Sequence, residues 1–119
     1  MRIYAKDDMF IILSKAMDGL SMRHQIIADN IANVDTPGFK ARDVCFEDQL
    51  RSAITRGNPG SAGVVIHKYP GKTRLDGNSV DIDMESAKMA ETTVLYSAMS
   101  RLISERFSML RTVITEGRR

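Results

Sequence analysis

The side chains of this sequence that could do chemistry are few and far apart. Cys45 is the single cysteine, and its close neighbours include the acidic Asp43 and Glu47. Reactive cysteines lie among basic groups that stabilise the thiolate, so these neighbours do not predict a nucleophile. Neither histidine, His24 or His67, has a second metal ligand at helical spacing. The pattern therefore predicts no cysteine chemistry and no zinc site.

A cluster of oxygen-bearing side chains is a candidate calcium site. Asp76, Asn78, Asp81 and Asp83 lie within eight residues of one another. An EF-hand loop needs its glycine at the sixth position, and Gly77 lies in the wrong place for that loop. The sequence also lacks a glycine-rich phosphate loop, a zinc-protease motif and a nucleophile elbow. We expect a protein that is not an enzyme and that carries no cofactor or metal.

Composition excludes two further classes. The chain of 119 residues has 17 basic and 15 acidic side chains, and the two signs are interspersed. This balance argues against a nucleic-acid partner. The longest apolar run, residues 9–13, is far shorter than the ~20 residues of a membrane span. Asp7 and Asp8 precede this run and argue against a secretory signal, so the chain is expected to stay in the cytosol or to leave by another route.

Two long segments have the periodicity of helices. The first, residues 8–34, repeats apolar positions alternately three and four residues apart, which is a heptad seam with His24 as its polar member. The second, residues 84–116, has a wider apolar face and arginines near its end, and Asp83 is its expected N-cap. They would be roughly 40 Å and 50 Å long.

The segment between them, residues 35–83, is rich in glycine and proline. Its periodicity predicts a short helix over 43–55 that Asp43 caps, and a flexible loop over 56–63. Residues 64–66 and 80–84 have strand patterns, and they are expected to pair as a short β-hairpin. The fold class is therefore mainly α, with two long terminal helices in a coiled-coil-like pairing and a loop-rich middle, in one domain over 1–119.

Neither long helix can bury its apolar stripe alone. An antiparallel intramolecular pairing is the simplest solution, but it covers only part of two such stripes. The remaining apolar surface predicts assembly with other chains. The positions expected to pack helix against helix are Leu13, Met17, Leu20, Ile27, Ile31, Leu95, Met99, Leu102 and Leu110.

Two segments that proline or glycine interrupts remain. In the first, Pro37 cannot continue a helix, and Pro37-Gly38 suits the two central positions of a type II turn. The second, residues 75–81, predicts a turn at Asp76, Gly77 and Asn78. From the residues alone, these segments are a helix stop and a turn.

Taken together, these segments carry a family resemblance. Residues 30–43, NIANVDTPGFKARD, resemble the N-terminal signature of the flagellar rod, hook and axial family. Residues 75–85, LDGNSVDIDME, in this order and at this distance, are similar to the family's proximal rod members. The resemblance implies an assembly motif at Asn30, Asn33, Asp35, Thr36, Pro37, Gly38, Phe39, Asp76, Gly77 and Asn78.

The resemblance also implies a role. Such subunits leave the cytoplasm unfolded through the flagellar type III export apparatus, without a cleaved signal peptide. They assemble in the periplasm as the helical rod of the basal body, which transmits torque and encloses the export channel. The implied partners are other copies of the chain, other proximal rod proteins, the MS ring and the rod adaptor FliE. One departure is the short stretch between residues 54 and 75, which leaves no room for a sizeable outer domain.

Three alternatives stay open at this point. A paralogous proximal-rod protein would share the first motif but would typically end in an Asn-rich stretch, which residues 102–119 lack. A cytosolic coiled-coil adaptor would not need the segment over 30–39. A small nucleic-acid binder is disfavoured by the near-neutral charge and the scattered aromatic residues.

Overall fold

The computed structural model of the chain describes residues 6–68 and 72–117. The elements in order are α1 (Lys6–Ala32), β1 (Arg42–Cys45), α2 (Glu47–Thr55), the short 3₁₀ helix η1 (Pro59–Ser61), β2 (Val65–Lys68) and α3 (Ile82–Glu116). The predicted class is confirmed, because two long terminal helices flank a short helix and a two-stranded hairpin. The molecule is elongated, with principal extents of 69 × 27 × 15 Å.

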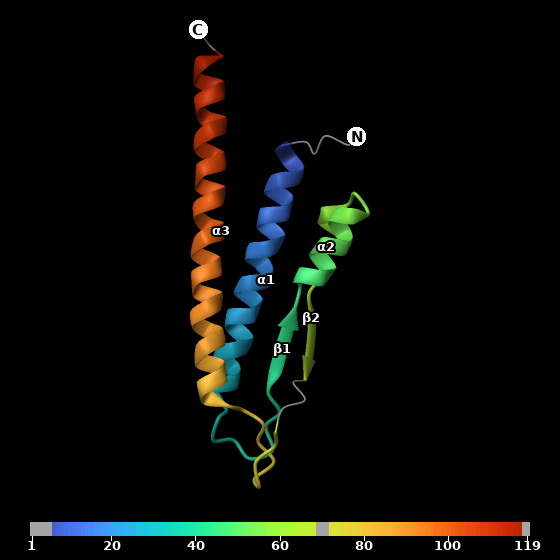
Figure 1. Cartoon of the computed structure of the whole chain (residues 1–119), viewed down its shortest axis with the longest axis vertical. Coiled ribbons are helices and arrows are strands. Elements are labelled where there is room, and N and C mark those ends of the chain that lie inside the picture. The colour runs from blue at the N-terminus through green and yellow to red at the C-terminus, as the bar shows by residue number, and fades with distance from the viewer. Residues whose placement is uncertain (1–5, 69–71, 118–119) are drawn as a thin grey trace.

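The two long helices run antiparallel. The start of α1 and the end of α3 lie at the same end of the molecule, and α3 extends well beyond α1 (Figure 1). Near that end the rings of Phe10 and Phe107 stack, with centroids 4.8 Å apart. The antiparallel pairing that the sequence predicted is therefore present within a single chain.

The start of α3 differs from the prediction. Its N-cap is Asp81, whose carboxylate accepts hydrogen bonds from the backbone N–H groups of Asp83 (3.1 Å) and Met84 (3.2 Å). The expected cap Asp83 lies inside the first turn, where its negative charge suits the helix dipole. Because this cap starts the helix at Ile82, the strand predicted over 80–84 does not form.

The hairpin has another partner than the one predicted. β2 pairs antiparallel with β1, with Arg42 opposite Lys68 and Cys45 opposite Val65. The first residues of the helix predicted over 43–55 are thus in a strand, so Asp43 does not cap α2, which begins at Glu47. The cause is tertiary: side chains of α1 hydrogen-bond the β1 backbone at Arg42 and at Val44 and hold it extended. The loop predicted over 56–63 contains η1.

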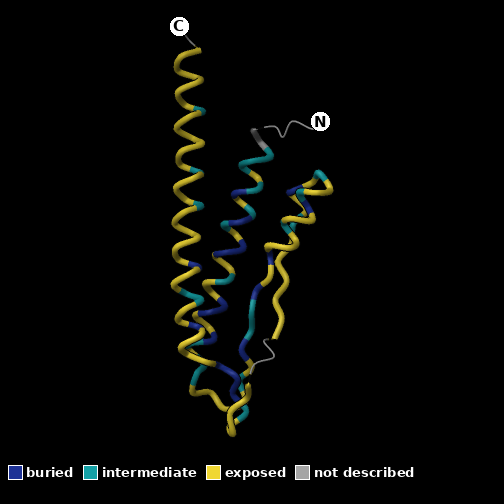
Figure 2. Tube along the Cα trace, in the orientation of Figure 1, coloured by how far each residue is buried: buried dark blue, intermediate teal, exposed yellow. Residues whose placement is uncertain are grey.

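The hydrophobic core lies between α1 and the β1–α2 segment. Burial follows α1 and β1, whereas α3 is exposed along most of its length (Figure 2). The core cluster consists of Ala16, Leu20, Ile26, Val44 and Phe46, with the partly buried Leu50 and Met99 packed against it. The ring of Phe46 lies directly on the backbone of α1 at Gly19, where an added Cβ would be 2.3 Å from the ring Cγ. Glycine is required there for close packing.

Gly19→Ala should therefore destabilise the protein, although alanine is the better helix former by roughly 1 kcal/mol. Forcing an extra methyl group into a packed core costs about 1–3 kcal/mol, and here it must displace the Phe46 ring. We expect a lower urea midpoint by circular dichroism. Gly63→Ala is the matched control, since its Cβ would meet open space. Equal midpoints for the two variants would contradict the proposed Gly19–Phe46 contact.

Candidate assembly site

The two segments that proline and glycine interrupt in the sequence meet at the end of the molecule where α1 ends and α3 begins (Figure 1). The backbone N–H of Gly38 donates to the carbonyl of Asp76 at 2.9 Å, and that of Ser79 donates to the carbonyl of Phe39 at 3.0 Å. We call this region, residues 30–39 with residues 76–85, the polar junction. It connects the end of α1 to the start of α3.

Asn78 holds the turn that follows α1. Its side-chain amide donates to three backbone carbonyls, those of Asn33 (2.8 Å), Val34 (3.0 Å) and Thr36 (2.7 Å). Its amide oxygen accepts from the backbone N–H of Val80 at 2.7 Å. These carbonyls belong to the turn that follows α1, which ends at Ala32, and a buried carbonyl needs a hydrogen-bond donor. Asn78 is fully buried, so it supplies these donors where water does not reach.

Asn30, in the last turns of α1, makes a second set of buried contacts. Its amide group donates to the carbonyl of Arg42 at 2.8 Å and to Oε2 of Glu85 at 3.0 Å. Its amide oxygen accepts from the backbone N–H of Arg42 at 3.0 Å. Asn30 is fully buried as well. The Asn30 side chain of α1 therefore binds both the backbone of β1 and a carboxylate in the first turns of α3.

Glu85 is a member of the junction that sequence reasoning missed. Its side chain is buried, and Lys88 Nζ lies 3.5 Å from its Oε1 and 3.8 Å from Oδ2 of Asp43. A signal was available, because Glu85 lies seven and fourteen residues before Thr92 and Met99, which face α1. Extending that helical face toward the start of α3 places the Glu85 carboxylate in the interface with α1. A buried carboxylate there requires hydrogen-bonding or charged partners.

Two glycines let the segments approach. Gly38 has φ 77°, and the N–H of Phe39 donates to the carbonyl of Thr36 at 3.3 Å, so the predicted type II turn is confirmed. Gly77 has φ 84°, and a Cβ on it would lie 3.2 Å from the Cα of Gly38. The side chain of Lys40 donates to the Gly77 carbonyl across the same contact.

The other residues of the predicted assembly motif lie around this contact. Asn33 donates to the carbonyl of Asp29 at 2.8 Å and accepts from the hydroxyl of Thr36 at 3.1 Å. Asp35 and Pro37 are exposed on the loop. The carboxylate of Asp76 accepts from the backbone N–H of Asn78 at 3.1 Å. These contacts are within one chain, and the role of these residues in assembly stays a prediction.

The positions expected to pack helix on helix fall into three groups. Leu13, Leu20 and Ile27 are buried within the chain. Partly buried are Met17, Ile31, Met99 and Leu110. Leu95 and Leu102 are exposed at 36% and 44%. The α1 positions are therefore largely covered by the chain itself, and the α3 positions are left open.

An ion pair next to the core fixes β1 and α2 on α1. The Arg23 guanidinium lies 4.8 Å over the Phe46 ring, donates to the carbonyl of Val44 at 3.0 Å and reaches Glu47 Oε1 at 2.7 Å. Burial disfavours the charged guanidinium, but the hydrogen bond and charge of Glu47 outweigh it and raise the pKa of Arg23. Burial likewise acts to raise the pKa of Glu47, yet the hydrogen bond from Arg23 prevails and lowers it.

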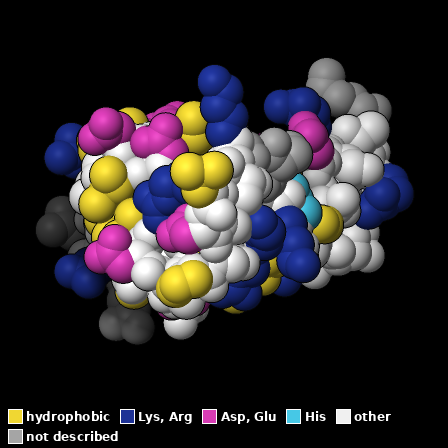
Figure 3. Space-filling view, turned by 90° about the horizontal axis from the view of Figure 1, so that it is seen from below, with side chains coloured by type: hydrophobic (Ala, Val, Ile, Leu, Met, Phe, Trp, Pro, Cys, Tyr) yellow, Lys and Arg dark blue, Asp and Glu magenta, His cyan; other side chains and the backbone are white. Residues whose placement is uncertain are grey.

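The surface at the junction end is charged on both sides. Viewed from that end, most acidic side chains lie on the α3 side and a group of Lys and Arg lies toward the hairpin (Figure 3). Within residues 6–68 and 72–117, no group of three or more His, Cys, Asp or Glu side chains could hold a metal ion. No helix of the described part of the chain is long and apolar enough to cross a membrane.

Asn78→Asp should disrupt the junction. It replaces the donors of a fully buried amide with an anionic acceptor facing three carbonyls. Each buried group left unsatisfied costs about 1–3 kcal/mol, so we expect a loss of at least ~3 kcal/mol in guanidinium titrations. Asn58→Asp, at an exposed position, is the control and should change stability by no more than ~0.5 kcal/mol. Similar losses of stability in both variants would show that the amide donors of Asn78 do not stabilise the junction.

The ion pair predicts a pH dependence. Because the pKa of Glu47 is lowered in the folded state, its contribution is complete above the ordinary carboxyl pKa of about 4.3 and is lost as the pH falls through the lowered value. Glu47→Gln should therefore lower the melting temperature at neutral pH, and the difference from wild type should shrink toward acid pH. Asp48→Asn, at a carboxylate 86% exposed, should show a smaller difference. A difference in melting temperature between Glu47→Gln and wild type that grows as the pH falls would refute this role of Glu47.

Comparison with known proteins agrees with the geometry. The family model described as "Flagella basal body rod protein" matches residues 12–40, which span most of α1 and the first segment of the junction. A flagellar basal body rod protein FlgB of Proteus mirabilis (strain HI4320) is 30% identical, covering 93% of this chain and 96% of the relative.

Other bacteria have similar proteins. FlgB of Escherichia coli (strain K12) is 27% identical, covering 87% of this chain and 90% of the relative. FlgB of Borrelia hermsii is 31% identical, covering 82% of this chain and 89% of the relative. These alignments run through both long helices and the junction between them. The chain therefore belongs to the family of flagellar basal body rod proteins FlgB.

Proposed function

We propose that this chain is a structural subunit of the proximal flagellar rod, which assembles with copies of itself and with other proximal rod proteins into a helical tube. The observation that carries the proposal, beside family membership, is the exposed apolar surface of α3. Among its exposed residues are Val94 (68%), Leu102 (44%), Phe107 (56%), Met109 (61%), Val113 (56%) and Ile114 (54%). Such a surface on a small protein is typical of a site that other chains cover.

The difference in burial between the two long helices supports α3 as the carrier of the exposed apolar assembly surface. α1 is covered on one side by α3 and on another by β1 and α2, and its Leu20 and Ile27 are each 2% exposed. α3 packs on α1 along one side alone and is buried at Glu85 and Thr92. A charge at Ile27 would therefore unfold the subunit, and it would not test assembly.

The finer parts of the proposal rest on the family resemblance. We propose that the subunit is exported through the flagellar type III apparatus, lies in the periplasmic part of the basal body, and contacts the MS ring and the adaptor FliE. The names of the relatives favour this role over a paralogous rod component and over a cytosolic coiled-coil adaptor. Torque transmission and enclosure of the export channel follow from a place in the rod.

The experiment places a charge on the exposed α3 surface. Val113→Asp leaves the core untouched but buries a carboxylate wherever a neighbouring chain covers this residue. In cells that produce only this variant, we expect lost swimming and more than about a tenfold reduction of the chain in purified basal bodies, since ~1.4 kcal/mol already gives a factor of ten. The isolated variant should keep the helix content of wild type.

The matched control is Thr112→Asp, on the adjacent residue that points away from α1. We expect it to support swimming. Normal swimming with Val113→Asp, or equal defects in both variants, would contradict the assignment of this α3 surface to assembly.

A further inference from the structure

One line of apolar side chains on α3 lies beside the face that packs on α1. Its members are spaced seven, seven and four residues apart and so share one face of the helix. They are Leu95 (36% exposed), Leu102 (44%), Met109 (61%) and Val113 (56%). We call this line the α3 stripe. Leu95 also lines a hollow between α3 and α2, whereas Met109 and Val113 line another hollow beside Met9 and Phe10 of α1.

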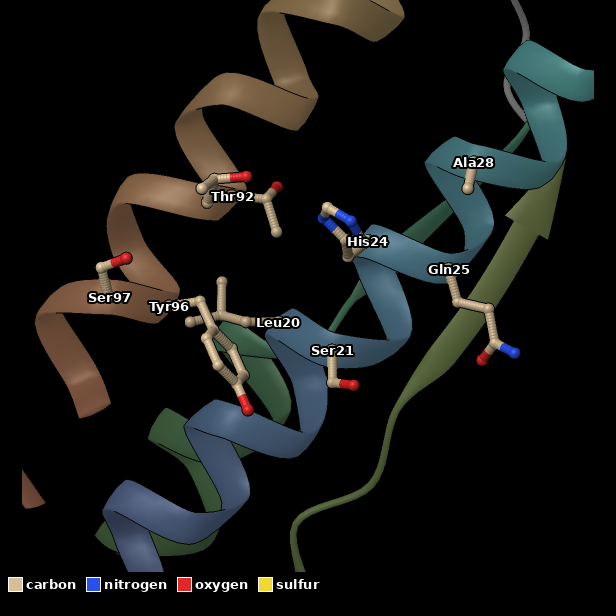
Figure 4. A pocket seen from close by; sticks show the side chains of 9 residues that line it. Leu20, Ser21, His24, Gln25, Ala28, Thr92, Tyr96 and Ser97 are labelled. Atoms are coloured by element: carbon tan, nitrogen blue, oxygen red, sulfur yellow. The ribbon is translucent and has the colours of Figure 1, made fainter.

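The opposite flank of the helix pair is hollowed. There α1 and α3 enclose a groove of about 620 Å³, which we call the α1–α3 groove (Figure 4). Its lining combines small side chains with larger ones. The small ones include Ser21, Ala28, Thr93 and Ser97, and the larger ones are Leu20, His24, Gln25 and Tyr96. Thr93 and Ser97 are each two residues from Leu95, a rotation of about 200° around the helix. The stripe and the groove therefore face opposite ways.

We infer that the α3 stripe of one copy packs into the α1–α3 groove of a second copy. This inference rests on the proposed function, and it identifies the contact by which one subunit would hold the next. A ridge of side chains on one helix fits into a groove between two others, which is how helices pack on one another. Since the groove lining carries no aspartate, glutamate, lysine or arginine, covering it with apolar side chains desolvates no such charge.

The charges beside the two surfaces are complementary. Arg106 lies on the face of the stripe, four residues after Leu102 and three before Met109. Asp18 lies at the edge of the groove face of α1, seven residues before Gln25, and it also lines a hollow beside Phe46 and Leu50. Both charged residues are exposed in the single subunit. Opposite charges at the rim of an interface favour one register over others.

The positions of the two surfaces along the helices fix how copies would be offset. The groove is level with residues 92–97 of α3, whereas the stripe is centred about ten residues further along. Two copies that point the same way would therefore be staggered by roughly 15 Å. A contact between different surfaces, repeated with a constant stagger, does not close into a ring and extends as a helix.

Cysteine crosslinking tests this contact in basal bodies purified from cells that produce the variant chain. In a Cys45→Ser background, Met109→Cys combined with Ser21→Cys should give a ladder of crosslinked multimers with a short bis-maleimide. The mismatched control combines Met109→Cys with Ala32→Cys, which lies on the same α1 face but three turns away from Ser21. It should give no ladder, and neither should Met109→Cys alone.

The other outcomes overturn the inference. Dimers from Met109→Cys alone would mean that the stripe meets itself, and a ladder with Ala32→Cys in place of Ser21→Cys would mean a different register. Purified rods that contain the chain but give no crosslink would overturn this contact and leave the proposed function intact. Absence of the chain from purified rods would overturn the proposed function.

A charge exchange gives an independent readout. Arg106→Asp should impair swimming by placing two carboxylates at the rim of the contact, and adding Asp18→Arg should restore it. A defect that Asp18→Arg leaves unchanged would contradict the register.

Discussion

The fold depends on hydrogen-bond donors for the carbonyl groups of the turn that follows α1. Asn78 supplies them from a segment more than forty residues away. Since Asp81 caps α3 three residues after Asn78, the same short segment holds the turn after one helix and begins the other. Asn30 fixes the second point by binding Arg42 and Glu85 at once. Two buried amides thus set the direction of both helices and the position of β1 between them.

This arrangement divides the molecule. Near the junction, α1, β1 and α2 enclose the core around Phe46, which the Arg23–Glu47 ion pair covers. Farther from the junction, α3 extends beyond α1 with half-exposed apolar side chains on it. The first part can hold its shape in a single chain, and the second is complete when other chains cover it. A subunit that must add to a growing tube needs both properties.

Sequence periodicity predicted the elements that depend on local patterns. The heptad spacing located α1, the wider apolar face located α3, and Pro37-Gly38 identified the turn. Periodicity failed where contacts between residues far apart in the sequence decide the local structure. Residues 43–45 have a helical pattern, yet they form β1 because Asn30 and Arg23 bind the strand backbone. The first motif looked like a simple helix stop, since its partner Asn78 is far away in the chain. The α1–α3 groove was missed because it needs the relative rotation of two helices.

The most direct test of this account is hydrogen–deuterium exchange by mass spectrometry on the free subunit and on purified rods. We expect slow exchange at the junction, α1 and β1 in both states, because their backbone hydrogen bonds are buried within one chain. Residues 102–116 of α3 should exchange fast in the free subunit and slowly in rods. Equal protection of these residues in both states, or fast exchange at the junction in the free subunit, would contradict the account.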